Sequence, residues 1–139
     1  CELWRGAKAG SMRSEVQKQF CSAIPDNDGN LLIENLIIAG RRFEAQLLFC
    51  GDELLKVELS LRLADNEIVS SQIVTSLSKL YAKKYGPVDF EKSEKDLWQR
   101  QWLHRGTSIR MTAYNNQGFP SSLFIEYSES DAVQSIDLI

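Results

Sequence analysis

The side chains that carry out most enzymatic chemistry are sparse in this sequence and form no familiar motif. His104 is the only histidine, so a histidine pair for acid and base catalysis, or a histidine cluster for a metal, is excluded by count. A nucleophilic pair of His104 with Cys21 or Cys50 remains open, but no sequence feature orients either thiol toward the imidazole. The sequence has no Gly-rich phosphate loop, no Gly-x-Ser-x-Gly and no Cys-x-x-Cys. We expect no catalytic residues, no metal and no other cofactor.

The run from Asp26 to Asn30 has the oxygen-rich side chains of a calcium loop. In such a loop a glycine stands at about the sixth position and a bidentate glutamate at about the twelfth. In this sequence Gly29 comes two positions too early, and Ile37 stands where the glutamate belongs. We interpret the run as a polar turn after Pro25.

A binding surface is the better functional prediction, because tryptophan, arginine and tyrosine gather in the last third of the chain. Trp98, Arg100 and Trp102 share one strand parity, and Arg110 and Tyr114 share one on the next predicted strand. If both sets face solvent together, they form a patch of the composition that is enriched at interface hot spots. For Trp98 and Trp102, burial in the core is the alternative. These five are the candidate protein-binding residues.

The cysteines bear on where the protein works. Cys1, Cys21 and Cys50 leave one residue over after any pairing. In one interpretation Cys1 is the acylated first residue of a mature bacterial lipoprotein, and Cys21 and Cys50 form a disulfide in an oxidising compartment. The protein is then a periplasmic or outer-membrane lipoprotein that contacts a membrane only through the lipid on Cys1. In the alternative the protein is cytoplasmic or an excised domain, and all three are free thiols.

Length and composition predict a single folded domain over residues 1–139. Hydrophobic residues make up 43% of the chain and charged residues 25%, which is ordinary for globular proteins and argues against disorder. A net charge of -3 repels polyanions at long range, so nucleic acid is not an expected partner. The longest apolar stretch, residues 31–39, is interrupted by Glu34 and is far shorter than the roughly 20 residues that cross a bilayer.

Two amphipathic helices are expected. Met12, Val16 and Phe20 recur at four-residue spacing and form one apolar stripe. The second helix begins after Asn66 and ends at Gly86, which precedes a proline and so marks a strong stop.

The remaining segments alternate as strands do. Residues 42–49 and 54–63 predict a half-buried antiparallel hairpin, and three more strands are expected near residues 98–104, 107–114 and 123–127. Helix followed by three strands thus occurs twice. We predict an α+β fold of two tandem α-βββ units, an antiparallel sheet with two helices packed on one face. The units cover residues 11–63 and 66–128, followed by a tail over residues 129–139.

The opening of the first helix resembles a known family. Residues Gly10-Ser-Met-Arg-Ser-Glu-Val16 are similar to the Gly-Met-Ser/Thr-x-x-Glu-Val opening of the small lipoprotein accessory of the outer-membrane β-barrel assembly machine, although Ser11 and Met12 stand in the reverse order. The doubled unit of a helix and strands also resembles the tandem architecture of the β-lactamase inhibitor protein. These resemblances imply an exported, non-catalytic domain that works by binding another protein.

Together, these observations predict a non-catalytic protein-binding domain of the bacterial cell envelope, with another protein as its partner. The alternative is an inhibitor or immunity protein that blocks an enzyme by inserting the charged loop of residues 88–96 into a cleft. A hydrolase with a hidden site is the third interpretation, and it requires a pocket that holds His104 beside a carboxylate or a thiol.

Overall fold

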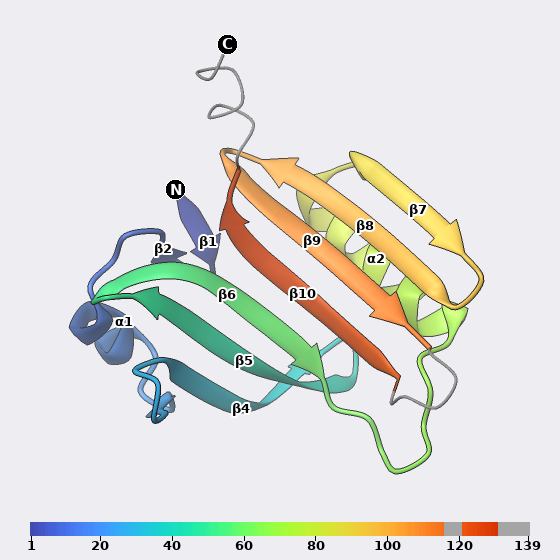
Figure 1. Ribbon diagram of the computed structural model, residues 1–139. Coiled ribbons are helices and arrows are strands. Elements are labelled where there is room, and N and C mark those ends of the chain that lie inside the picture. Colours follow the sequence, from blue (N-terminus) through green and yellow to red (C-terminus); the bar gives the residue numbers. More distant parts are fainter. Residues whose placement is uncertain (116–120, 131–139) are drawn as a thin grey trace.

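The computed structural model describes residues 1–115 and 121–130, and most of this part of the chain is β-sheet. Strands hold 51% of the described residues and helices 18%. One antiparallel sheet of eight strands has the order β3-β4-β5-β6-β10-β9-β8-β7 (Figure 1). Its strands are β3 (Ile24–Pro25), β4 (Leu31–Ile38), β5 (Arg41–Cys50), β6 (Glu53–Leu61), β7 (Phe90–Glu94), β8 (Leu97–His104), β9 (Thr107–Tyr114) and β10 (Ser122–Glu129).

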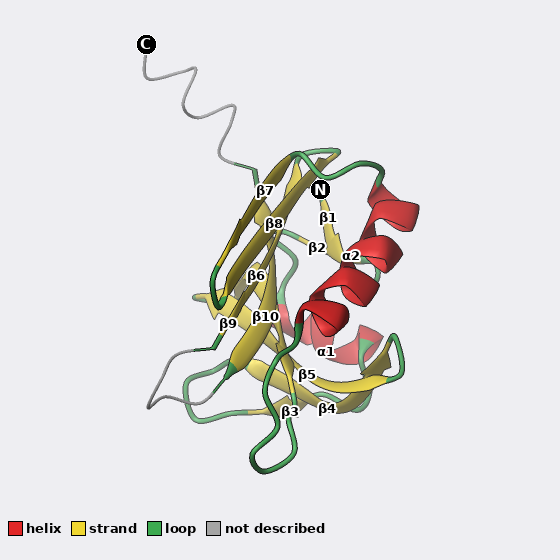
Figure 2. Ribbon diagram, turned by 90° about the vertical axis from the view of Figure 1, so that its right-hand side faces the viewer, coloured by secondary structure: helices red, strands yellow, loops and turns green. Residues whose placement is uncertain are grey.

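Three further elements lie on the inner face of the curved sheet or at its end. They are the hairpin of β1 (Glu2–Trp4) and β2 (Ala7–Lys8), the short helix α1 (Arg13–Gln19), and the longer helix α2 (Ser71–Tyr85). Figure 2 shows α2 running along the inner side of the sheet, with β1 and β2 beside it. The hairpin contributes Leu3, Trp4 and Ala7 to the core, whereas α1 buries only Val16.

The predicted α+β fold is therefore wrong. The structure is mostly sheet, and two helices do not cover its face as a layer. Each helix is followed by four strands rather than three, because β3 and β7 are short edge strands that had been assigned to loops. The predicted boundaries at 11–63 and 66–128 remain a prediction. The predicted tail starts at the last residue of β10, and residues 131–139 lie outside the described part of the chain.

The β5–β6 hairpin shows why alternation predicts strands and where it fails. Phe43, Ala45 and Leu47 are buried on the inner face, as their spacing predicts. Alternation from the buried Val57 would put Leu55 on the same face, but Leu55 is exposed and Leu54 is buried instead. The register shifts at Leu48/Phe49, so that Phe49 pairs with Leu54. Such a bulge adds one residue to a strand and reverses the parity beyond it.

Neither helix of the described residues is long and apolar enough to span a membrane.

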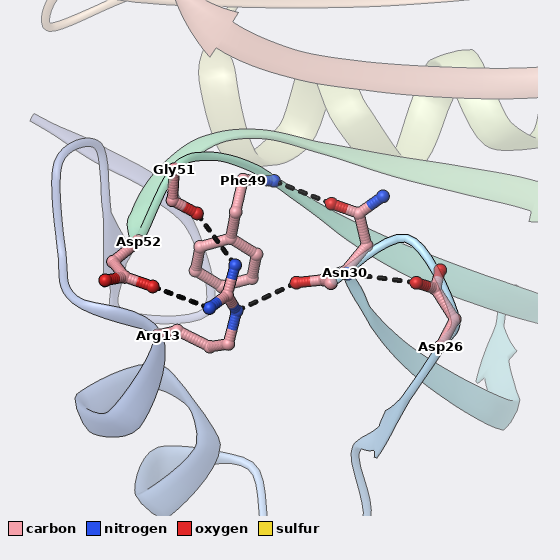
Figure 3. Close-up of polar contacts among 7 residues, drawn as sticks. Arg13, Asp26, Asn30, Phe49, Gly51 and Asp52 are labelled. Carbon is pink, nitrogen blue, oxygen red and sulfur yellow. Dashed lines mark hydrogen bonds and ion pairs between the residues drawn. The ribbon is translucent and has the colours of Figure 1, made fainter.

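Arg13 joins three segments at the end of the sheet where α1 lies (Figure 3). Its guanidinium donates to the carbonyl oxygen of Gly29 at 2.8 Å, to that of Gly51 at 2.7 Å and to the Asp52 carboxylate at 2.6 Å. The same group lies over the Phe49 ring, 5.1 Å from its centroid. The side chain thus ties α1 to the turn before β4 and to the β5–β6 turn.

The polar run after Pro25 forms the neighbouring turn. The Asp26 carboxylate accepts the backbone N–H groups of Asp28 at 2.8 Å and of Asn30 at 3.0 Å, and the bond from Asn30 is the main reason that the pKa of Asp26 is lowered. The Asn30 side-chain oxygen in turn accepts the Phe49 N–H at 2.9 Å (Figure 3). Asp26 is therefore used to close the turn.

We expect Arg13→Ala to lower the free energy of unfolding by about 2 kcal/mol. Hydrogen bonds to charged groups contribute roughly 1.5–3 kcal/mol, and the lower part of that range applies because the side chain is 31% exposed. Urea unfolding followed by circular dichroism measures the change. Arg13→Lys is the matched control, since it keeps the charge but cannot reach three acceptors at once, and we expect it to lose about half as much. Equal stability of wild type and Arg13→Ala would contradict a stabilising role for these contacts.

Candidate functional site

Helix α2 forms one wall of the principal hollowed surface. The Ser70 hydroxyl caps its start by accepting the Ile73 N–H at 3.2 Å. The helix ends at Gly86, whose φ of 91° suits a residue without a side chain. Val74, Leu77 and Tyr81 are buried against the sheet. The side of α2 that faces the β4–β5 turn and the β1–β2 hairpin remains partly open.

Three hollows follow this open side of α2, and we call them together the α2 groove. The N-terminal hollow, of about 420 Å³, lies between Ile68 and Ile73 on one side and Ala39 and Arg41 on the other. The other two hollows follow toward the C-terminal end of α2, and Lys84 and Tyr85 line both of them. A helix rises 1.5 Å per residue, so the 15 residues of α2 make the groove roughly 20 Å long.

The middle hollow, of about 200 Å³, has aromatic and aliphatic walls. Trp4 and Ile38 come from β1 and β4, and Leu80 and Tyr85 come from α2. Two cations stand over aromatic rings at its border. The Arg5 guanidinium lies 4.9 Å from the centroid of Trp4, and the Lys84 ammonium lies 5.3 Å from that of Tyr85.

Two buried tyrosines, Tyr81 and Tyr127, also line the middle hollow. Their hydroxyls form a hydrogen bond with each other. Burial raises the pKa of Tyr81 to about 12, with the Tyr127 hydrogen bond opposing it in part. Burial also raises the pKa of Tyr127 well above 10.0, and its neighbour Tyr81 adds to that effect. Both groups are therefore neutral hydroxyls at pH 7, and each can donate one hydrogen bond.

The C-terminal hollow, of about 370 Å³, contains Cys1, Glu2 and His104 together with Arg105. The Cys1 thiol is directed to the Gly106 carbonyl oxygen at 3.7 Å and to the Glu129 carboxylate at 3.9 Å. His104 packs edge-on against the Tyr85 ring at 5.2 Å. Cys1 and Glu2 thus line the same hollow as His104, and among the described residues no hydrogen bond joins His104 to a thiol or a carboxylate.

The unpaired cations set the electrostatic character of the groove. Arg41 is paired with Glu67 at 2.8 Å. By contrast, no ion pair within the described part of the chain involves Arg5, Lys84 or Arg105. Among the described residues that line the C-terminal hollow, Glu2 is a carboxylate, and the Glu129 carboxylate lies 3.9 Å from the Cys1 thiol there. Of the described residues that line the middle hollow, two are cations and none is a carboxylate.

The five predicted binding residues do not form one surface. Trp102 pairs with Ile109 and faces the core, where its indole N–H donates to the Gly86 carbonyl oxygen at 3.1 Å. Trp98 is half-buried on the same face and packs against the core. Arg100 lies on this face too and pairs with Glu91 at 3.2 Å.

Arg110 and Tyr114 point from the other face of the sheet, because their cross-strand partners are Gln101 and Leu97. The turn after His104 determines which residues of β8 and β9 lie opposite each other. A two-residue turn at Arg105 and Gly106 pairs His104 with Thr107, which fixes every later pair of the hairpin. It places Arg110 opposite Gln101 rather than opposite Arg100.

The three cysteines are all exposed free thiols. The predicted disulfide between Cys21 and Cys50 is not formed in the structure, and the Cys21 thiol contacts the Lys18 carbonyl oxygen at 3.6 Å. Lipidation of Cys1 stays a prediction.

The residues of the groove lacked a local sequence signal. Trp4 and Arg5 belong to a hairpin whose strands are too short for alternation to reveal, and Tyr127 lies far along the chain from both. Only the folded sheet brings them to α2.

Comparison with known proteins adds no family to this description. The resemblances to the lipoprotein accessory and to the β-lactamase inhibitor protein stay predictions. No protein-family model matches the chain, and no curated protein or solved structure matches it.

Proposed function

We propose that this protein is a non-catalytic protein-binding domain of the bacterial cell envelope and that the α2 groove is its binding site. The observation that carries the proposal is the groove itself, where exposed apolar side chains and unpaired cations lie together. Ile68 and Leu80 are exposed at its border, and Trp4, Arg5 and Tyr85 line its middle hollow. Tryptophan, tyrosine and arginine are the residue types that dominate binding energy at protein interfaces.

Burial of this surface is the source of affinity in this proposal. Removing apolar area from water gives roughly 25 cal/mol per Å², so an exposed leucine or isoleucine gains about 1 kcal/mol or more when a partner covers it. The rigid helix and sheet hold the groove open, which limits the ordering entropy lost on binding. The proposal includes acylation of Cys1, whose thiol is exposed.

The inhibitor interpretation has less support. The expected inserting loop, residues 88–96, contains the edge strand β7, which pairs with β8 along its whole length. The carboxylates Glu91 and Glu94 pair with Arg100 and Lys92 of the same sheet edge. They are therefore not free to enter an enzyme cleft as an extended loop.

Photo-crosslinking tests the proposed site. A photoreactive phenylalanine analogue at Leu80, in the groove, is expected to give a covalent adduct with a discrete partner protein in living cells. The same analogue at Leu103, on the opposite face of the sheet, is the matched control, because the two leucines are similarly exposed at 43% and 47%. We expect no adduct from position 103.

Two results would count against the site. Equal adducts from both positions would indicate non-specific contact, and an adduct from position 103 alone would move the interface to the outer face. Mass analysis of the same sample reports whether Cys1 carries an acyl group, which tests the envelope location separately.

A further inference from the structure

We infer that the middle hollow recognises a carboxylate next to an apolar side chain, within an acidic segment of the partner protein. The inference rests on the proposed function, since it names the chemistry that the α2 groove selects. The volume of about 200 Å³ suits a single docking group rather than a whole domain surface. Further hollows lie on both sides of it along α2, so a chain can enter and leave.

The first argument is the pair of cations. Arg5 and Lys84 both line the hollow although they come from the β1–β2 turn and from α2. Each stands over an aromatic ring, Trp4 or Tyr85, and the contact limits its motion. Neither has an ion-pair partner among the described residues. An anion between them gains two charge-assisted hydrogen bonds.

The second argument is a hydroxyl hydrogen-bond donor that has no acceptor among the described residues. When two hydroxyls share a hydrogen bond, one proton lies between them and the other is left over. In the buried pair Tyr81 and Tyr127, both of which line the hollow, no other hydrogen bond of the described residues uses that second proton. An ionised carboxylate is a pure acceptor and satisfies it, whereas a cationic group would leave it unpaired.

The third argument is the apolar wall. Trp4, Ile38 and Leu80 surround the same space as the cations. Trp4 is already buried, but a bare anion would leave Ile38 and Leu80 in contact with water, whereas a carboxylate beside a leucine, isoleucine or aromatic residue covers them. Cations, a spare donor and an apolar wall together select an acidic, apolar peptide segment.

Selection of peptides from a random 12-residue display library on the intact protein tests this. We expect enriched peptides to carry Asp or Glu within a few positions of a large apolar residue. For the best peptide, Arg5→Gln and Lys84→Gln should each weaken binding about five-fold, since a partly exposed charge pair contributes up to roughly this factor. Lys83→Gln, on the adjacent helix position but outside the hollow, is the matched control and should not change affinity. Fluorescence polarisation of the labelled peptide gives the Kd.

The outcomes separate the inference from the proposed function. Replacing the peptide's Asp or Glu by Asn or Gln should weaken binding as much as removing the cations does. Amidation of the peptide's C-terminus should leave its affinity unchanged. If amidation alone abolishes binding, the hollow recognises a chain terminus and the segment assignment is wrong. If the selected peptides lack acidic residues but Leu80→Asp weakens their binding, the inference is wrong and the groove remains the binding site. If no selected peptide is released by Leu80→Asp, the proposed binding site fails as well.

Discussion

Trp102→Ala is expected to lower the free energy of unfolding by about 4 kcal/mol, as truncation of buried aromatic residues generally does. Trp102 is only 1% exposed, and its ring lies 5.5 Å from that of Tyr81 on α2. The substitution opens a cavity between β8 and α2. It also leaves the Gly86 carbonyl oxygen, which ends the helix, without the indole donor. Both losses act on the contact that holds α2 against the sheet.

Urea unfolding followed by circular dichroism measures this effect. Trp102→Phe is the control, because it keeps most of the apolar volume and a ring beside Tyr81 but removes the donor. We expect it to lose about 1–2 kcal/mol. A loss below about 1 kcal/mol for Trp102→Ala would contradict its position in the core and reopen its assignment to a binding surface.

Raising the pH from 10 to 12 is expected to lower the free energy of unfolding by about 2 kcal/mol. In the folded protein burial raises the pKa of Tyr81 from 10.0 to about 12, while in the unfolded chain the hydroxyl loses its proton near pH 10. Between these values the unfolded state binds fewer protons, so stability falls as pH rises, by at most about 1.4 kcal/mol per unit. The contribution is fully present below pH 10 and is lost as the pH passes through 12.

Tyr81→Phe separates this effect from other alkaline titrations. The variant loses about 1 kcal/mol at pH 7 because the hydrogen bond to Tyr127 is gone. Between pH 10 and 12 its stability should fall less steeply than that of wild type, since the phenolic proton is absent. The two proteins are compared by urea unfolding at several pH values. Parallel curves would show that Tyr81 is not protected from ionisation by burial.

The antiparallel sheet was predicted correctly from sequence because its long strands alternate. Sequence signals also located the end of α2 at Gly86, which has an unambiguous stop signal, whereas the helix begins at Ser71 rather than directly after Asn66. The α+β assignment failed on the short elements. Every residue of β7 is exposed, so it shows no alternation, and β1 and β2 have three and two residues. A pattern that repeats every second residue cannot be recognised in so few positions.

The candidate site was harder to predict, for a geometric reason. Strand parity correctly grouped Trp98 with Trp102, and Arg110 with Tyr114, but it does not relate one strand to the next. The relation depends on hairpin register, which moved the two groups to opposite faces. The groove could not be predicted from the sequence, because Arg5 and Lys84 line the same hollow only after the hairpin and α2 pack on one sheet.

Strand β10 has a consequence for synthesis of the protein. It pairs with β6 on one side and with β9 on the other, yet it is the last strand of the described chain to leave the ribosome. Until then the backbone amides along one edge of β6 have no strand to bind, and such an edge readily pairs with another nascent chain. A transcript truncated before Ser122 would therefore yield an aggregating fragment, not a smaller stable domain, and co-translational chaperones have most to protect in that interval.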